Sequence, residues 1–416
     1  LPIEKMNQKL FSRDFILVVI GQIISLFGNA AIRFALPLYL LNQTGSSALY
    51  GTVTACAFIP AILLSPIGGI VADRVNKRNI MVLLDFVTAA VIAVFSLLMN
   101  TMNTTILLTV TLMILYGIAG AYQPSVQASV PSLVSPENIM AANSIINTIS
   151  SFASLLGPVI GGILYSAYGL KMVLRVCIVC FAFSAVMEIF IQIPFTKQAF
   201  GGGLWKTVKS DFSESIRFIR KEKSIIGKVL LVICGMNLFL SSMILVGLPY
   251  MITEVLDLGA FQANRLYGFA EGALAAGGLT GGICSGILAN RFSIQKSGNL
   301  IIICAVSVFP MGVVLLLTSS GIISYLVITI CCFVIMAAST IFTVQMMSFV
   351  QAETPPEFIG KVISVILTAA MCAQPLGNAL YGILFEVCMG FEYTVMLFAG
   401  AISLLIAIGT RNIFRE

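Results

Sequence analysis

A polar stretch of the chain, Gly68-Gly69-Ile70-Val71-Ala72-Asp73-Arg74-Val75-Asn76-Lys77-Arg78, lies between two long apolar segments and marks where a helix leaves a membrane. Gly69 lies one turn before Asp73, so a neighbouring helix can approach closely there. The Asp73 carboxylate can then accept hydrogen bonds from the N-terminal amides of another helix. We expect Gly69, Asp73, Arg74 and Arg78 to form a conformational motif; the alternative is an ordinary basic loop with a chance glycine.

The composition is that of a polytopic membrane protein. Of the 416 residues, 59% are hydrophobic and 10% are charged, which excludes a soluble globular chain. Histidine is absent, so a proton-linked step near neutral pH would depend on carboxylates. Cys177-x-x-Cys180 has no second pair to complete a metal site. We expect no metal, no cofactor, no cleavable signal peptide and no enzymatic activity.

Twelve apolar segments follow one another along the chain, and most reach the length of about 20 residues that crosses a bilayer. They cover residues 14–41, 48–73, 79–99, 104–130, 137–167, 170–195, 225–253, 264–289, 297–318, 321–350, 358–388 and 391–411. With both termini in the cytoplasm, 19 of the 23 lysines and arginines fall on the cytoplasmic side and three on the outer side. This bias predicts a multi-pass plasma-membrane protein with both termini cytoplasmic.

The chain divides into two halves that repeat. Residues 1–195 and 225–416 are predicted to form two six-helix bundles, and residues 196–224 an amphipathic linker on the cytoplasmic leaflet. Pro136-Glu137-x-Ile139 recurs 220 residues later as Pro356-Glu357-x-Ile359. Gly162-Ile163-Leu164-Tyr165 recurs as Gly382-Ile383-Leu384-Phe385 at the same spacing. The sequence therefore predicts an all-α membrane protein built from two pseudo-symmetric bundles, with a site between them.

The polar stretch resembles the loop 2–3 signature of the major facilitator superfamily, whose fold is this arrangement of twelve helices. A second stretch, Ala153-x-x-x-Gly157-Pro158-x-x-Gly161-Gly162, looks like the antiporter motif of drug-exporting members, with Ala153 in place of a glycine. Pro158 should kink its helix, and Gly161 and Gly162 should allow tight packing across the bundle interface. A kink without any bearing on transport direction is the alternative.

Residues of the first apolar segment point to a particular group within this superfamily. Gly21-Gln22-x-x-Ser25-x-x-Gly28-Asn29 and Leu36-Pro37-Leu38-Tyr39 are similar to bacterial macrolide-efflux and siderophore-exporter relatives. Many of those relatives have an acid where this chain has Asn29. The resemblance implies a bacterial inner-membrane protein that exports amphipathic molecules by proton antiport.

Charges inside the apolar segments are costly and are therefore candidates for function. Arg33 and Glu271 are expected in the outer half of the membrane, where Glu271 could bind a proton or a cationic substrate, or pair with Arg33. Asp85 is a second proton candidate, or else pairs with Arg74 or Arg78. Glu188 is expected near the cytoplasmic end of its helix, with its carboxylate reaching out to the interface.

Polar amides are expected to line a central cavity, although interhelical hydrogen bonding is the alternative for each. The candidates are Gln22, Asn29, Gln123, Gln127, Asn147, Asn237, Gln345, Gln374 and Asn378. We expect a monomer that handles a small amphipathic substrate, protons and membrane lipids, and no nucleic acid. A lipid or metabolite transporter of the same fold is the first alternative; a membrane enzyme or channel lacks the convergent residues it would need.

Overall fold

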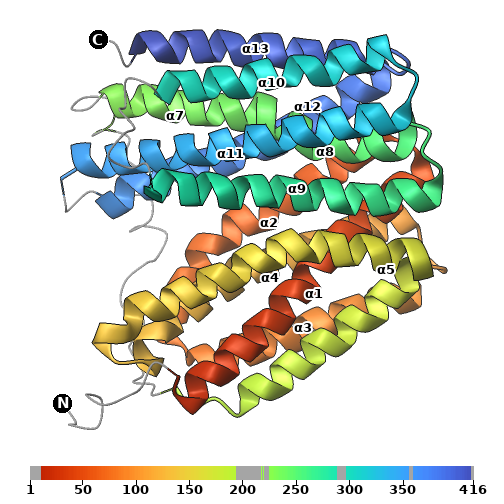
Figure 1. The fold of residues 1–416 in the computed structure, drawn as a ribbon. Coiled ribbons are helices and arrows are strands. Elements are labelled where there is room, and N and C mark those ends of the chain that lie inside the picture. Colours follow the sequence, from red (N-terminus) through yellow and green to blue (C-terminus); the bar gives the residue numbers. More distant parts are fainter. Residues whose placement is uncertain are drawn as a thin grey trace. The chain divides into compact units, whose positions relative to one another are not determined.

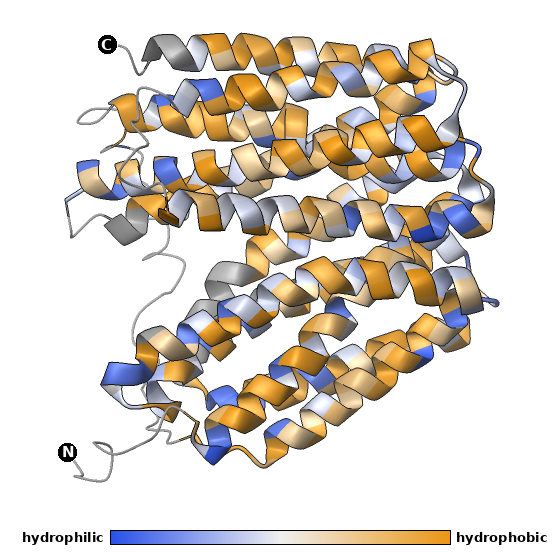
Figure 2. Cartoon of the chain, viewed as in Figure 1, coloured by the Kyte–Doolittle hydropathy of each residue, from blue (hydrophilic) through white to orange (hydrophobic). Residues whose placement is uncertain are grey.

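The computed structural model describes residues 11–193, 224–287, 297–355 and 359–413, together with residues 217 and 219, and every regular element in this part is helical (Figure 1). Ten of these helices are long and apolar enough to cross a membrane. Hydrophobic residues predominate along most of their length (Figure 2). The chain is therefore an all-α integral membrane protein.

Within its described residues, the first half contains five helices: α1 (Arg13–Thr44), α2 (Ser47–Arg74), α3 (Lys77–Leu98), α4 (Thr104–Leu133) and α5 (Ile139–Ile189). A short 3₁₀ turn, η2 (Pro136–Asn138), precedes α5. Asn76 begins α3 by accepting a hydrogen bond from the amide of Arg78, and Asn103 begins α4 in the same way. Inside α5, Gly169 has φ 70° and ψ −179°, which only glycine adopts easily. This break divides α5 into the two segments predicted at 137–167 and 170–195.

The second half begins with one continuous span made of α7 (Ser224–Met236), the π-helical turn η3 (Asn237–Ser241), α8 (Ser242–Tyr250) and a second π-helical turn, η4 (Met251–Val255). It continues with α9 (Ala260–Ile287), α10 (Ser297–Leu317), α11 (Gly321–Glu353), α12 (Ile359–Val387) and α13 (Glu392–Ile413). The described helices therefore account for all twelve predicted apolar segments.

The same helix pairings occur in both halves. In the first half, α3 packs against α4 and α5, and Asp85 of α3 lies beside Ser184 in the second segment of α5. In the second half, α10 packs against α11 and α13. The third helix of each half thus contacts the fourth and the sixth, as the internal repeat predicts.

Two compact units make up the structure, and each is described by itself. Unit 1 contains Leu1–Gln43, Cys56–Phe200 and Asn264–Gly272, so it includes one stretch of α9. Unit 2 contains Thr44–Ala55, Gly201–Ala263 and Ala273–Glu416, so it includes the start of α2. The linker predicted at 196–224 lies outside the described residues, apart from three positions.

Candidate functional site

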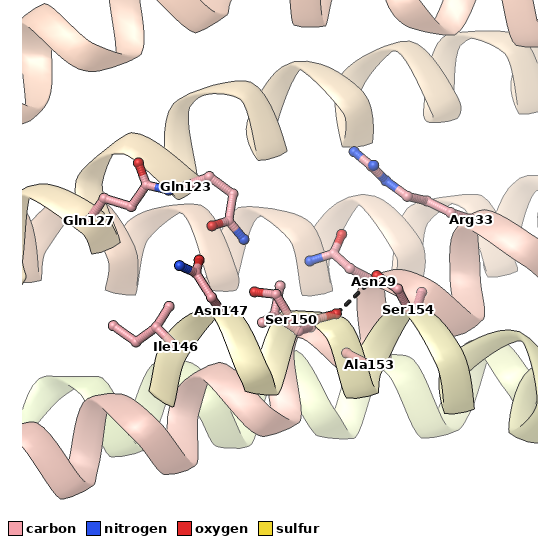
Figure 3. Close-up of a pocket in the computed structure, with 11 residues that line it drawn as sticks. Asn29, Arg33, Gln123, Gln127, Ile146, Asn147, Ser150, Ala153 and Ser154 are labelled. Atoms are coloured by element: carbon pink, nitrogen blue, oxygen red, sulfur yellow. Dashed lines mark hydrogen bonds between the residues drawn. The ribbon is translucent and has the colours of Figure 1, made fainter. Parts of the chain in front are cut away.

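Unit 1 contains a cavity of about 410 Å³ between α1, α4 and α5. Its lining combines amides, two hydroxyls, small apolar groups and one charge, and consists of Leu26, Asn29, Ala30, Arg33, Gln123, Gln127, Ile146, Asn147, Ser150, Ala153 and Ser154. Gln123 of α4 and Asn147 of α5 point toward each other across this space (Figure 3). The cavity can therefore offer both amide donors and amide acceptors to a bound molecule.

Arg33 is the charged residue in this lining. Its guanidinium carbon lies 3.9 Å from the centroid of the Tyr116 ring, which is a cation–π contact. Its Nε atom is buried and has no hydrogen-bond partner. A buried donor without an acceptor is costly, so turning this side chain toward an acceptor on a bound molecule would be favourable.

Four of the nine predicted amides line the cavity: Asn29, Gln123, Gln127 and Asn147. Gln22 lies deeper in unit 1 and donates to Tyr122, at 2.8 Å. Four others make hydrogen bonds elsewhere: Asn237 donates to the carbonyl of Ile233, Gln345 accepts from Ser297, and Gln374 donates to Asn378.

The proline motif of α5 packs directly on α1, the helix that carries Asn29 and Arg33. Gly157 faces Ala30, and Gly161 faces Ala31 and Phe34, so that a side chain at either glycine would collide with α1 or press against it. The backbone dihedral angles stay helical at Pro158, and the kink predicted at this residue stays a prediction. A proline inside a helix removes one backbone hydrogen bond, and here this loss does not interrupt α5.

Two glycine contacts bring helices from different parts of the sequence together. At the unit 1 crossing, Gly162 of α5 faces the backbone of Gly268 of α9. At the unit 2 crossing, Gly382 of α12 faces the backbone of Gly51 of α2. Gly162 and Gly382 are equivalent positions in the 220-residue repeat, so the two crossings are repeat-related.

Different polar groups accompany the two crossings. In unit 1, Asn42 donates to Asn264 at 2.8 Å, and the rings of Phe34 and Tyr267 stack at 4.7 Å. In unit 2, the carboxylate of Glu386 accepts from the hydroxyl of Ser46 at 3.0 Å and from the amide of Ala48 at 3.2 Å. Glu386 therefore caps the N-terminus of α2 with an anion. Sequence reasoning missed this residue; its only signal was a lone acid at a helix end.

Glu271 and Arg33 do not pair in the described structure. Glu271 lies in α9 and accepts a hydrogen bond from the Tyr267 hydroxyl at 3.1 Å, whereas Arg33 lies on the Tyr116 ring. Glu271 does not line the cavity. The structure therefore supports a local contact for Glu271 rather than an ion pair.

Asp85 and Glu188 lie together in a buried polar cluster of unit 1. Ser25 donates to Asp85 at 3.1 Å, and Tyr122 donates to Glu188 at 2.8 Å. Asp85 is 2% exposed and Glu188 is fully buried, so Glu188 does not reach the interface as the sequence suggested. The groups that act on Asp85 are Ser184 and Ser25 and include no described arginine, while the side chain of Arg74 lies outside the described residues.

The signature stretch is only partly visible. The backbone of Gly69, Asp73 and Arg74 is helical and lies at the end of α2. The side chains of Asp73 and Arg74 are outside the described part of the chain. Arg78 lies in the first turn of α3 and lines a second cavity of about 490 Å³ in unit 1, which Asp14 also lines. The capping role predicted for Asp73 stays a prediction.

Some known proteins resemble this chain in sequence, and others resemble it in fold. The chain is 23% identical over 419 residues to macrolide efflux protein A of Streptococcus pyogenes, covering 97% of this chain and 96% of that protein. It is 26% identical over 308 residues to the lysophospholipid transporter LplT of Yersinia pestis (strain Pestoides F), covering 70% and 73%.

The structure of a bacterial homologue of the iron transporter ferroportin in its inward-facing state superposes with a TM-score of 0.74, at 17% identity, over 96% of this chain and 98% of that one. This likeness concerns the fold alone. The sequence model of the Major Facilitator Superfamily matches residues 18–378. The chain is a membrane transporter, not an enzyme, and it belongs to the Major Facilitator Superfamily.

Proposed function

We propose that this transporter exports amphipathic small molecules, of drug, macrolide or siderophore type, in exchange for protons and by alternating access. The observation that carries the proposal is the cavity of unit 1, which amides from three helices line together with one guanidinium whose Nε lacks an acceptor. Its polar groups would orient a molecule, while Leu26 and Ile146 would contact the apolar part.

The packing of α5 supports a role for its proline motif in transport. Gly157 and Gly161 contact α1 directly, and α1 carries Asn29 and Arg33 into the cavity. A shift of α5 along α1 would therefore change the shape of the cavity. The macrolide efflux relative favours export as the direction.

A lipid-like amphiphile with an anionic head group is the second candidate. Arg33 supplies a positive charge within the cavity, and a phosphate or carboxylate oxygen would be a strong acceptor for its free Nε. The lysophospholipid transporter relative is consistent with this alternative. The two candidates differ in the substrate charge that Arg33 favours.

Transport into inverted membrane vesicles tests both. Dyes, macrolides, siderophores and lysolipids are assayed with and without a pH gradient, in the wild type and in Arg33→Gln. For an anionic amphiphile, the variant should raise KM at least tenfold, because it loses a charge-assisted hydrogen bond of about 1.5–3 kcal/mol. For an uncharged substrate, KM should change less than threefold.

Arg265→Gln is the matched control. Arg265 is exposed on α9 and contacts the Phe269 ring at 5.8 Å, away from the cavity lining. Its replacement should leave KM unchanged for every substrate. Failure of all four substrate classes to be transported by the wild type would overturn the proposal.

A further inference from the structure

The buried cluster of Asp85 and Glu188 lies apart from the cavity, and the proposed function leaves it unexplained. It combines side chains from four helices: Gln22 and Ser25 of α1, Asp85 of α3, Tyr122 of α4 and Glu188 of α5. We refer to these five residues as the acid cluster. All five are at most 4% exposed. Side chains buried to this extent need internal hydrogen-bond partners, because water cannot supply them.

The acid cluster contains more acceptors than donors. Gln22 donates to the Tyr122 hydroxyl, which in turn donates to Oε1 of Glu188. Oδ2 of Asp85, Oε2 of Glu188 and Oε1 of Gln22 are buried without any hydrogen-bond partner. Three buried oxygens without a protein donor lie in this one cluster, so a bound proton would be favourable there because it supplies a donor.

The charges of the cluster are unbalanced as well. Gly21 of α1 lies against both Glu188 and Ser184, and Ser184 lies beside Asp85, so the two carboxyl groups are neighbours. The titratable groups that face this pair from the packed helices are each other and Tyr122, and neither carboxyl forms an ion pair with a described lysine or arginine. Two adjacent buried carboxylates without a counter-ion repel each other, so binding of a proton is strongly favoured.

We propose that Asp85 and Glu188 form a shared proton-binding site, which in this state holds at least one proton between the two carboxyl groups. Protonation would turn one orphaned oxygen into a hydroxyl, which can donate to one of the other acceptors of the cluster. The donors of Tyr122 and Gln22 already point into the cluster, which fits a proton better than a metal cation that needs converging oxygens.

The site is connected to the cavity through two helices. Asn29, which lines the cavity, donates to the backbone carbonyl of Ser25, whose hydroxyl donates to Asp85. On α4, Tyr122 belongs to the cluster while its neighbour Gln123 lines the cavity. Release of the proton would therefore disturb the two helices that hold the substrate, and this coupling rests on the proton antiport proposed above.

Infrared difference spectroscopy of the purified full-length protein tests proton binding without any transport. The carboxylic C=O signal is followed as the pH is raised. We expect a titrating signal in the wild type that is lost in Glu188→Gln and in Asp85→Asn, and that titrates at a different pH in Tyr122→Phe. Glu271→Gln is the matched control, because Glu271 is a membrane acid outside the cluster, and it should keep the signal.

A signal that survives in both Glu188→Gln and Asp85→Asn would overturn the proposed proton-binding site, and so would a signal that disappears in Glu271→Gln. A signal that responds to sodium at constant pH and not to protons would overturn it too. If one variant fails to fold, the other variant and Tyr122→Phe still decide the outcome.

A transport measurement separates this inference from the proposed function. Glu188→Gln in proteoliposomes should retain substrate exchange without a gradient and lose uphill transport driven by a pH gradient. Gradient-driven transport at the wild-type rate would contradict the coupling. If the wild type itself shows no gradient-driven transport, proton antiport fails, while the infrared titration still decides whether the cluster binds a proton.

Discussion

In unit 1, α5 and α9 cross at Gly162 and Gly268, and in unit 2, α12 and α2 cross at Gly382 and Gly51. The backbone contact is the same in both, because the positions are related by the repeat. The polar groups beside the contacts differ: a neutral pair, Asn42 and Asn264, in unit 1 and an anionic helix cap, Glu386, in unit 2. The repeat thus preserved the close approach of the helices, while the side chains around it diverged.

Among the variants considered, closing the space at either crossing should reduce thermal stability and transport the most. In Gly51→Ala the new methyl group would collide with the backbone carbonyl of Asn378, and in Gly268→Ala with that of Pro158. Neither carbonyl can move without shifting its helix, so we expect a loss of about 1–3 kcal/mol of stability at the crossing. Transport rate in vesicles should fall as well, because the helices must shift to relieve the collision.

Gly282→Ala provides the control for this pair, because Gly282 lies on α9 with no atom within 4 Å of an added methyl group. Alanine also has the better helix propensity, so this variant should be at least as stable as the wild type. Unchanged melting temperature and transport in both crossing variants would show that the helices do not need this contact.

Removing the charge of the Glu386 cap should cause the next largest loss of stability. Glu386→Gln keeps the shape and loses the anion that accepts from Ser46 and Ala48, at a cost of about 1 kcal/mol. The effect should shrink at high salt, because Glu386 is exposed. Asn42→Ala in unit 1 should cost about 0.5–1.5 kcal/mol with no dependence on salt. Melting temperatures of both variants at low and high salt check the difference, and equal salt dependence would contradict it.

The proline of the unit 1 crossing should have a smaller effect on stability. Pro158→Ala supplies an amide that can bond the carbonyl of Ser154, in a helix that is already regular at this point. We therefore expect unchanged or slightly higher thermal stability, together with altered coupling or increased leak. The equivalent region of the second half carries Gly377-Asn378 without a proline. Identical transport and identical dependence on the pH gradient would mean that the motif does not act in coupling.

Glu271→Gln should change thermal stability the least. The residue is hydrogen-bonded to Tyr267 beside the unit 1 crossing, and it does not pair with Arg33. An amide oxygen can accept the same bond, so the change in melting stability should stay below about 1 kcal/mol. Loss of proton-driven efflux in a well-folded variant would instead make Glu271 the proton carrier.

Prediction from sequence succeeded where the bilayer imposes a simple rule. The lengths of the apolar segments follow from its thickness, so the helices of the structure coincide with the twelve predicted segments to within a few residues at most boundaries. The boundary predicted between the fifth and sixth segments contains Gly169, where the backbone leaves the helical path, whereas the kink predicted at Pro158 stays a prediction. A proline removes one hydrogen bond, whereas a positive φ ends the helical path altogether.

The sequence by itself determined the membrane class, the twelve segments, the internal repeat and the family, because each depends on composition or on spacing along the chain. Only the tertiary structure decided which polar side chains share a site. Tyr122 and Gln123 are neighbours in sequence, yet one donates to Glu188 and the other lines the cavity. In a membrane helix nearly every face is apolar, so hydrophobic periodicity does not reveal which neighbour covers each face. That choice is made by helix packing, which brought Asp85 and Glu188 together from segments about a hundred residues apart.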